Sequence, residues 1–283
     1  MEERKTQPTG AVKCARFWHR RANRRIRCAR LLFCFALSTL QSHGAVLVAH
    51  YEFEGDFINS VDGVAANTSG LSPLSFVSGP QTLGQAVSFI DNQGHEVWRN
   101  VQGDGLSFDS FTVAFFIRTE QANWRVPLTM EAATAQEHRM ALQISAAGNI
   151  YLANTDGLPG ATGIWTDPNP AAYVADGQWH HVAWTADAAA NSSILYVDGV
   201  QVGDNSWGAT ADVKLWMLGK LKGSVVNNYT GSIDDFRLYD APLTQNEIRN
   251  LIPVIPEPST VVLLALGGLL FGRRFLRGDR CVS

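Results

Sequence analysis

Apolar and polar residues alternate along the chain between residues 46 and 251, with the period of two that is typical of strands with one buried face. Every second residue is apolar in LVAHYEFEG (47–55), and FTVAFFIRT (111–119) repeats this alternation. Turn-forming residues recur at intervals of roughly 8 to 15 residues. The pattern therefore predicts an all-β fold in which two antiparallel sheets pack face to face as a sandwich.

Two hairpins and one long loop stand out within this region. The segments RMALQIS and NIYLA flank SAAGN, which predicts a turn at Gly148. SSILYV is joined to VQVG through Asp198-Gly199, a dipeptide that accepts the positive φ values of a type I′ turn. Thr155–Ala172 is rich in Gly and Pro, so we expect a long surface loop there.

One short helix is expected at the end of the alternating region. In TQNEIRNL, Thr244 and Glu247 form a capping box, in which each side chain accepts from the backbone N–H of the other residue. Ile248 and Leu251 would then pack the helix on a sheet edge.

Charge is distributed unevenly over the 283 residues. Residues 1–44 carry 10 Lys and Arg against 2 Asp and Glu, and residues 253–283 carry 4 against 2, which leaves 9 against 22, a net −13, in residues 45–252. This acidic region argues against nucleic acid as a partner, because binding to phosphates needs clustered Lys and Arg. It contains none of the four cysteines, so it forms neither an internal disulfide nor a thiolate metal site.

The N-terminal residues have the pattern of a secretory signal. The basic segment RRANRRIRCAR precedes the apolar stretch Leu31–Leu40, and small residues suited to cleavage follow at Gly44 and Ala45. We expect residues 1–44 to be a signal peptide with a long basic leader, and residues 45–252 to form one domain.

The C-terminal residues, 253–283, contain an apolar run from Val261 to Phe271. This run is shorter than the roughly 18 to 20 residues that span a bilayer. By itself it is either a sorting address or a marginal membrane anchor.

The order of motifs around that run carries a resemblance. Pro256-Glu257-Pro258 precedes it and Arg273-Arg274 follows it. This arrangement resembles the PEP-CTERM sorting tail of Gram-negative bacteria that make extracellular polysaccharide. The resemblance implies an exosortase as processing partner, transient membrane association through the tail, and a final location at the outer surface or in the extracellular matrix.

Three segments in fixed order carry a second resemblance. HYEFEGDFINSVDG, DGQWHHVAWTADAAANSSILYVDGVQVG and YTGSIDDFRLYDAPLTQNEIRNL resemble the LamG-like branch of the concanavalin A-like lectin/glucanase superfamily. The resemblance covers nearly all of residues 46–251 and implies the jelly-roll fold. Because that fold carries lectins, hydrolases, adhesins and spacers alike, function has to be argued from site residues.

Catalysis finds little support in the sequence. A retaining glucanase of the superfamily would need a Glu-x-Asp-x-x-Glu strand, because its two carboxyl groups lie about 5 to 5.5 Å apart. Glu52 and Glu54 come nearest, sharing a face of the first predicted strand in a different residue order. We expect no catalytic residue; the alternative is a polysaccharide lyase or hydrolase that uses these two carboxylates.

The adjacent histidines His180 and His181 are expected on opposite faces of one strand, because successive residues of a strand alternate between faces. They therefore do not ligate one metal ion together. We expect one of them to be half-buried beside Trp179 and the other to be exposed.

A calcium ion is the better metal hypothesis. In SIDDFRLY, Ile233 is apolar in one phase of the alternation and Phe236 in the other, which predicts a bulge at Asp234-Asp235. Ca²⁺ takes about six to eight oxygen ligands, including backbone carbonyls. The superfamily resemblance implies a structural calcium here, with Asp234 as a ligand and Asp56 as a weaker second; the alternative is that these acids face water.

Carbohydrate binding requires exposed aromatic rings next to polar side chains. Trp165 in the long loop is the leading candidate, with Trp98, Trp124 and Trp207 behind it, and for each the alternative is a rim or core position. The expected function is that of a secreted, non-catalytic protein that binds extracellular polysaccharide or acts as a scaffold. An inert spacer is a further alternative.

Overall fold

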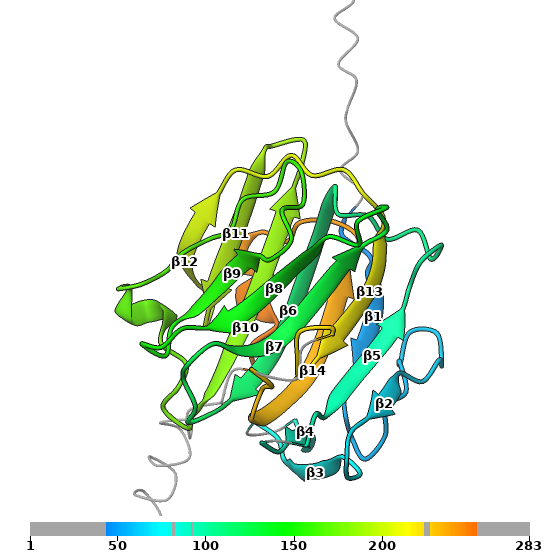
Figure 1. Cartoon of the computed structure of the whole chain (residues 1–283), viewed down its shortest axis with the longest axis vertical. Coiled ribbons are helices and arrows are strands. Elements are labelled where there is room, and N and C mark those ends of the chain that lie inside the picture. The colour runs from blue at the N-terminus through cyan, green and yellow to red at the C-terminus, as the bar shows by residue number, and fades with distance from the viewer. Residues whose placement is uncertain (1–43, 81–82, 92, 224–226, 254–283) are drawn as a thin grey trace, which may run out of the picture. The chain divides into compact units, whose positions relative to one another are not determined.

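Two antiparallel β-sheets account for nearly all regular structure in residues 44–80, 83–91, 93–223 and 227–253, which the computed structural model describes (Figure 1). The larger sheet consists of β1 (Leu47–Tyr51), β3 (Ser75–Ser78), β4 (Gln85–Phe89), β6 (Ser110–Arg118), β10 (Trp179–Asp187), β11 (Ser192–Val197), β12 (Val200–Asn205) and β14 (Gly231–Tyr239). The smaller sheet consists of β2 (Asn67–Ser69), β5 (Glu96–Asn100), β7 (Arg125–Ala132), β8 (Arg139–Ile144), β9 (Ile150–Asn154) and β13 (Val213–Leu218). This arrangement confirms the predicted all-β sandwich.

The strand order places sequence-distant strands side by side. The larger sheet runs β12-β11-β10-β6-β14-β4-β3, with β1 also paired to β14, and the smaller sheet runs β2-β5-β13-β7-β8-β9. Strands β6 and β14 are neighbours in the middle of the larger sheet although they are far apart in the sequence.

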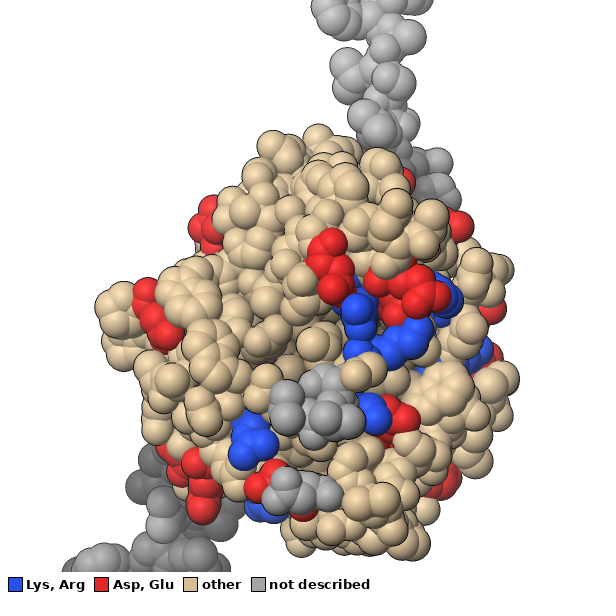
Figure 2. Space-filling model, viewed as in Figure 1, with Lys and Arg blue, Asp and Glu red and all other residues tan. Residues whose placement is uncertain are grey.

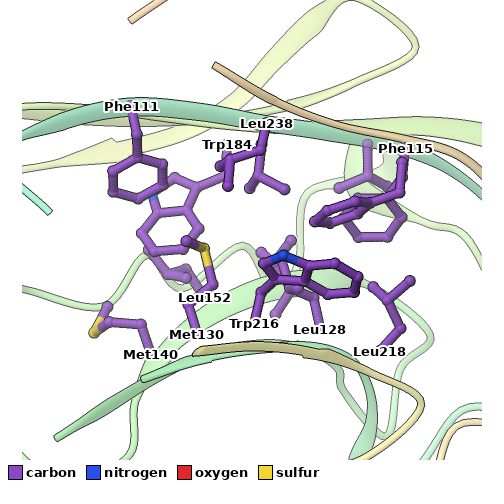
Figure 3. Packing of buried hydrophobic residues seen from close by; sticks show 14 of the residues in the cluster. Phe111, Phe115, Leu128, Met130, Met140, Leu152, Trp184, Trp216, Leu218 and Leu238 are labelled. Atoms are coloured by element: carbon purple, nitrogen blue, oxygen red, sulfur yellow. The ribbon is translucent and has the colours of Figure 1, made fainter. Parts of the chain in front are cut away.

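The core lies between the sheets and contains side chains from both. Figure 3 shows Phe111 and Trp184 pointing from one layer toward Leu152 and Trp216 on the other. The rings of Phe111 and Trp184 meet edge to face at 4.7 Å, a favoured aromatic geometry. Phe111, Val113, Phe115 and Ile117 of β6 belong to the core between the sheets, whereas Ala114, which is also buried, packs with Ile248 on the other face; the predicted alternation is confirmed.

The predicted turns have the expected backbone geometry. Asp198 and Gly199 have φ values of 50° and 71°, as a type I′ turn between β11 and β12 requires. Gly148 has a φ of 87° in the connection between β8 and β9.

The predicted bulge in β14 is present. Asp234 pairs with Phe116 and Arg237 pairs with Ala114, so β14 uses three steps where β6 uses two. The extra residue is accommodated at Asp235, whose φ is 52°. The bulge restores the inward direction of the apolar side chains that follow it.

The helix α1 (Gln245–Asn250) begins at Thr244, whose capping box with Glu247 is confirmed. Its position differs from the expectation of a sheet edge. Ile248 is fully buried against Ala114 and Ala183 on the outer face of the larger sheet. These small side chains of β6 and β10 leave room for the helix to approach the sheet, which the apolar pattern of the helix alone does not reveal.

The long loop after β9 is partly ordered by pairing. Ile164 exchanges two backbone hydrogen bonds with Leu152, so this part of the loop runs beside β9. A short 3₁₀ helix, η1 (Pro170–Ala172), ends the loop. Among the residues described, no helix is long and apolar enough to cross a membrane.

Candidate functional site

Three aromatic side chains gather on the outer face of the smaller sheet. Trp165 is 58% exposed and Trp124 is 41% exposed, while Tyr151 contacts both rings and is buried. The ring centroids of Tyr151 and Trp165 are 4.6 Å apart, and those of Trp124 and Trp165 are 6.1 Å apart with an interplanar angle of 32°. We call these three residues the aromatic cluster.

The local backbone explains why the aromatic cluster faces outward. Ile150 and Leu152 of β9 point into the core, so Tyr151 between them points out. Ile164 also belongs to the core, and its pairing with Leu152 turns Trp165 to the same outer side as Tyr151.

Trp124 joins the aromatic cluster through a left-handed backbone turn before β7. Asn123 and Trp124 have φ values of 78° and 64°, which non-glycine residues adopt rarely. The N–H of Asn123 donates to the carbonyl of Ser145 at 3.0 Å, which ties the turn to the end of β8. Such strained backbone is retained where the surrounding structure enforces it, and it occurs often at binding sites.

Polar groups border the aromatic cluster. The Tyr151 hydroxyl donates to Gln143 Oε1 at 2.6 Å, and Ser145 Oγ donates to Asp167 Oδ1 at 3.1 Å. Burial, together with the negative charge of Asp167, raises the pKa of Tyr151 to about 12, so its phenol keeps its proton at neutral pH. The site therefore combines apolar ring faces with hydrogen-bonding groups, as sites for ring-shaped polar ligands require.

Charged side chains are few on this surface, although Asp167 lies close enough to Tyr151 to raise its pKa. In Figure 2 the surface over β8 and β9 is formed mainly by uncharged residues, and Lys, Arg, Asp and Glu gather toward β7 and β13. The carboxylate of Glu131 in β7 is fully buried and lies 3.2 Å from Lys214 Nζ and 2.8 Å from Lys222 Nζ. These ion pairs compensate a buried charge that would otherwise be costly.

The other tryptophans singled out in the sequence lie elsewhere. Trp207 is fully buried and donates through Nε1 to the carbonyl of Phe108 at 2.8 Å, so its candidacy as an exposed ring is wrong. Trp98 is half-buried on β5. Sequence reasoning missed Tyr151 and Gln143, although the alternation in NIYLA already places Tyr151 on the outer face.

The two nominated calcium ligands differ in their surroundings. Asp234 is fully buried, and its Oδ2 has no hydrogen-bond partner among the described residues. Burial and the nearby carboxylates of Asp235, Glu54 and Glu52 raise the pKa of Asp234 to about 8. Asp56 is exposed, and its Oδ1 accepts from the N–H of Ile58 at 2.9 Å.

Metal-ligating side chains are not otherwise clustered. In the part of the chain that the structure describes, no group of three or more His, Cys, Asp or Glu side chains is placed to hold one ion. Glu52 and Glu54 follow the end of β1 at Tyr51, so they lie in a loop and not on the predicted strand face. Both are exposed.

The adjacent histidines point to opposite faces as predicted, but neither is exposed. His181 is buried against the ring of Phe116, and burial lowers its pKa to about 4. His180 is half-buried and contacts Asp198 at 2.8 Å and Asp176 at 3.0 Å. The expectation of one exposed histidine is wrong, because these carboxylates and the neighbouring strands cover both rings.

Comparison with known proteins identifies the family of the fold. The sequence profile described as the concanavalin A-like lectin/glucanases superfamily matches residues 91–249. A comparison with curated proteins finds no match.

Solved structures share the fold at low sequence identity. Domain 4 of AbnA, a GH43 extracellular arabinanase from Geobacillus stearothermophilus, in complex with arabinotriose, has a TM-score of 0.56 and 19% identity, over 74% of this chain and 99% of that domain. The binding domain of Paraclostridial Mosquitocidal Protein 1 has a TM-score of 0.53 and 18% identity, over 72% of this chain and 51% of that one. The Botulinum Neurotoxin serotype G binding domain has a TM-score of 0.54 and 15% identity, over 73% of this chain and 50% of that one.

Proposed function

This chain belongs to the concanavalin A-like lectin/glucanases superfamily, and we propose that it is an exported, non-catalytic carbohydrate-binding protein whose ligand stacks on the aromatic cluster. The observation that carries the proposal is the exposure of Trp124 and Trp165 side by side, over a buried Tyr151. Exposed tryptophans at one place on a monomer mark a binding surface, because burying them is favourable.

The chemistry of the aromatic cluster favours a neutral saccharide. Ring faces of Trp contact the C–H faces of a sugar ring, while Gln143 lies close enough to orient hydroxyl groups. The surface over β8 and β9 has little charge to recognise an ionic ligand (Figure 2). The structural likeness to an arabinanase domain solved with arabinotriose makes arabinan a reasonable first polysaccharide to test.

Affinity electrophoresis of the full-length chain in gels with neutral polysaccharides, arabinan included, tests this proposal. We expect Trp165→Ala and Trp124→Ala each to weaken binding by about tenfold, since an aromatic contact contributes roughly 0.5–1.5 kcal/mol beyond its buried area. Tyr173→Ala is the matched control, because Tyr173 is also 41% exposed but lies outside the cluster. Unchanged retardation of both tryptophan variants would overturn the assignment.

The chain length of the same polysaccharides, measured after incubation with the protein, tests the absence of catalysis. Polysaccharide that is incubated with the chain is expected to keep its chain length. Degradation that is lost in Glu52→Gln and Glu54→Gln would replace the binding proposal with a lyase or hydrolase.

We further propose a structural calcium ion at Asp234. Its buried Oδ2 without a partner is the group that a hard cation would satisfy, and the surrounding acids add to the attraction. Backbone carbonyls and water would supply the remaining ligands, since side chains alone do not complete a site among the described residues. Asp56 is the weaker second ligand and would have to turn toward the ion from its exposed position.

Thermal unfolding in EGTA and in Ca²⁺ tests this site. At a calcium concentration about 100 times Kd, binding adds about 2.7 kcal/mol of stability, or roughly 5 to 10 °C in Tm for a domain of this size. The shift is expected to vanish in Asp234→Ala and to persist in Asp204→Ala, a control at an exposed acid of β12. No calcium shift in the unmodified chain would overturn the site.

Export and sorting complete the proposal. Residues 1–43 of the N-terminal signal and the Pro256-Glu257-Pro258 motif lie outside the described residues, and both signals are proposed from sequence alone. An exosortase would remove the tail after transient membrane association and leave the domain at the outer surface or in the extracellular matrix. Intact-mass measurement of the secreted protein tests this, because processing near Pro258 removes Arg273 and Arg274.

A further inference from the structure

We propose that a groove on the outer face of the larger sheet is a second binding site, which takes the carboxylate of an acidic saccharide through Arg118. The groove has a volume of about 530 Å³, and its lining includes Ser88, Arg118, Thr230 and Ser232. This site is separate from the aromatic cluster, which lies on the smaller sheet.

Three residues of the groove, Arg118, Ser232 and Ser88, belong to a row of paired residues that crosses five strands. Trp179 of β10 pairs with Arg118 of β6, Arg118 with Ser232 of β14, Ser232 with Ser88 of β4, and Ser88 with Ser75 of β3. Directly paired residues of antiparallel strands share one face of a sheet. The strand neighbours of Arg118, Ser232 and Ser88 point into the core, so the row faces outward.

Arg118 is unusual among the cations of this acidic region. All nine Lys and Arg residues of 45–252 are described, and seven of them form ion pairs with Asp or Glu. Arg249 donates to the carbonyl of Gly199. Within the described residues the Arg118 guanidinium has neither a carboxylate nor a hydrogen-bond acceptor, and its partner is the ring of Trp179 at 4.9 Å.

This contact prepares Arg118 for a ligand. Stacking on Trp179 restricts the guanidinium while its N–H donors stay free. A planar guanidinium binds a carboxylate through two parallel hydrogen bonds, which a neutral group does not reproduce. The geometry therefore favours an anionic group with two coplanar oxygens.

Hydroxyl groups indicate that the anion belongs to a saccharide. Ser232 lies beside Arg118 in the row, Ser88 lies one strand further on, and the Thr230 hydroxyl is buried without a hydrogen-bond partner in the described part of the chain. The groove volume is in the range of about 300–1,000 Å³ that small-molecule sites occupy. Glu120 is exposed at the groove and opposes an anionic ligand, which makes it a useful probe.

Titration calorimetry of the full-length chain with oligogalacturonate tests the proposal, and the methyl ester of the same oligosaccharide is the uncharged control. We expect the acid to bind and the ester to bind at least tenfold more weakly. Arg118→Gln should weaken binding of the acid at least tenfold, and Arg118→Lys should weaken it less because charge remains while the planar fork is lost. Equal affinity for acid and ester, or an unchanged affinity in Arg118→Gln, would overturn the proposal.

Two further variants separate the possible failures. Glu120→Gln changes an exposed side chain and is expected to strengthen binding of the acid severalfold; unchanged binding would count against the site even if the Arg118 variants fail to fold. Trp165→Ala is expected to leave this binding unchanged, so failure of the aromatic cluster and failure of this groove give different results. Preference for a sulfated galacto-oligosaccharide over the uronate would overturn the carboxylate assignment.

Discussion

Opposite pH responses are predicted for the two adjacent histidines of β10. His181 is buried, its Nδ1 has no hydrogen-bond partner among the described residues, and burial lowers its pKa to about 4 despite the negative charges of Asp235 and Asp198. The positive charge of Arg237 acts in the same direction as burial. Replacement of His181 by Phe keeps an aromatic ring against Phe116 and removes the titrating group.

The magnitude follows from the difference between folded and unfolded pKa values. Below the unfolded value of about 6.5 the unfolded chain binds a proton that the folded chain rejects, so stability falls as pH falls toward 4. Between about pH 7 and pH 4.5 this single group costs about 2 kcal/mol of stability. His181→Phe is expected to abolish that part of the acid destabilisation. As pH falls from 7 to 4.5, the unfolding free energy of the variant minus that of the unmodified chain should therefore increase by about 2 kcal/mol.

Urea unfolding at several pH values measures this difference, at fixed calcium concentration. His180→Gln is the control, because the hydrogen bonds to Asp198 and Asp176 raise the pKa of His180. Stabilisation by charged His180 is fully present below about pH 6.5 and is lost as pH rises through the raised folded value, so this variant should be most destabilised in acid. If the unfolding free energies of His181→Phe and the unmodified chain differ by the same amount at every pH in this range, the reasoning is refuted.

Two further predictions concern backbone features that the sequence already indicated. Thr244→Ala removes the N-cap of α1 and its exchange with Glu247, and is expected to lower the unfolding free energy by about 1 kcal/mol in urea titrations. Gly199→Ala places a Cβ 2.6 Å from Arg249 Cγ at a φ of 71°. It should lower Tm more than the control Gly103→Ala, where φ is also positive but nothing lies near the new Cβ. Equal changes in Tm would mean that the contact with the helix is unimportant.

The alternation of apolar residues predicted more than the fold class. It placed Phe111 to Ile117 in the core and predicted a bulge at Asp234-Asp235 from one change of phase. Local motifs, the Asp-Gly dipeptide and the Thr-x-x-Glu pattern, predicted the type I′ turn at Asp198-Gly199 and the capping box at Thr244. These features depend on residues close together in the sequence, so local preferences and side-chain period are sufficient to predict them.

Side-chain period and local preferences did not predict contacts between segments that are far apart in the sequence. The sequence suggested Trp165 and Trp124 as separate candidates, but their meeting over Tyr151 depends on the pairing of the long loop with β9. In the same way, the burial of Trp207 follows from its contact with Phe108, nearly one hundred residues away.

The sequence by itself determined the position of strands such as β6, β8, β9, β11 and β14, the turns at Gly148 and Asp198-Gly199, and the inward-facing residues of β6, because these depend on a period of two and on local backbone preferences. Only the tertiary structure decided which strands are neighbours, and hence that Trp179, Arg118 and Ser232 lie in one row. Strand order is set by the burial of side chains from both sheets in a common core, and no local pattern encodes it. Both proposed binding sites arise from that order.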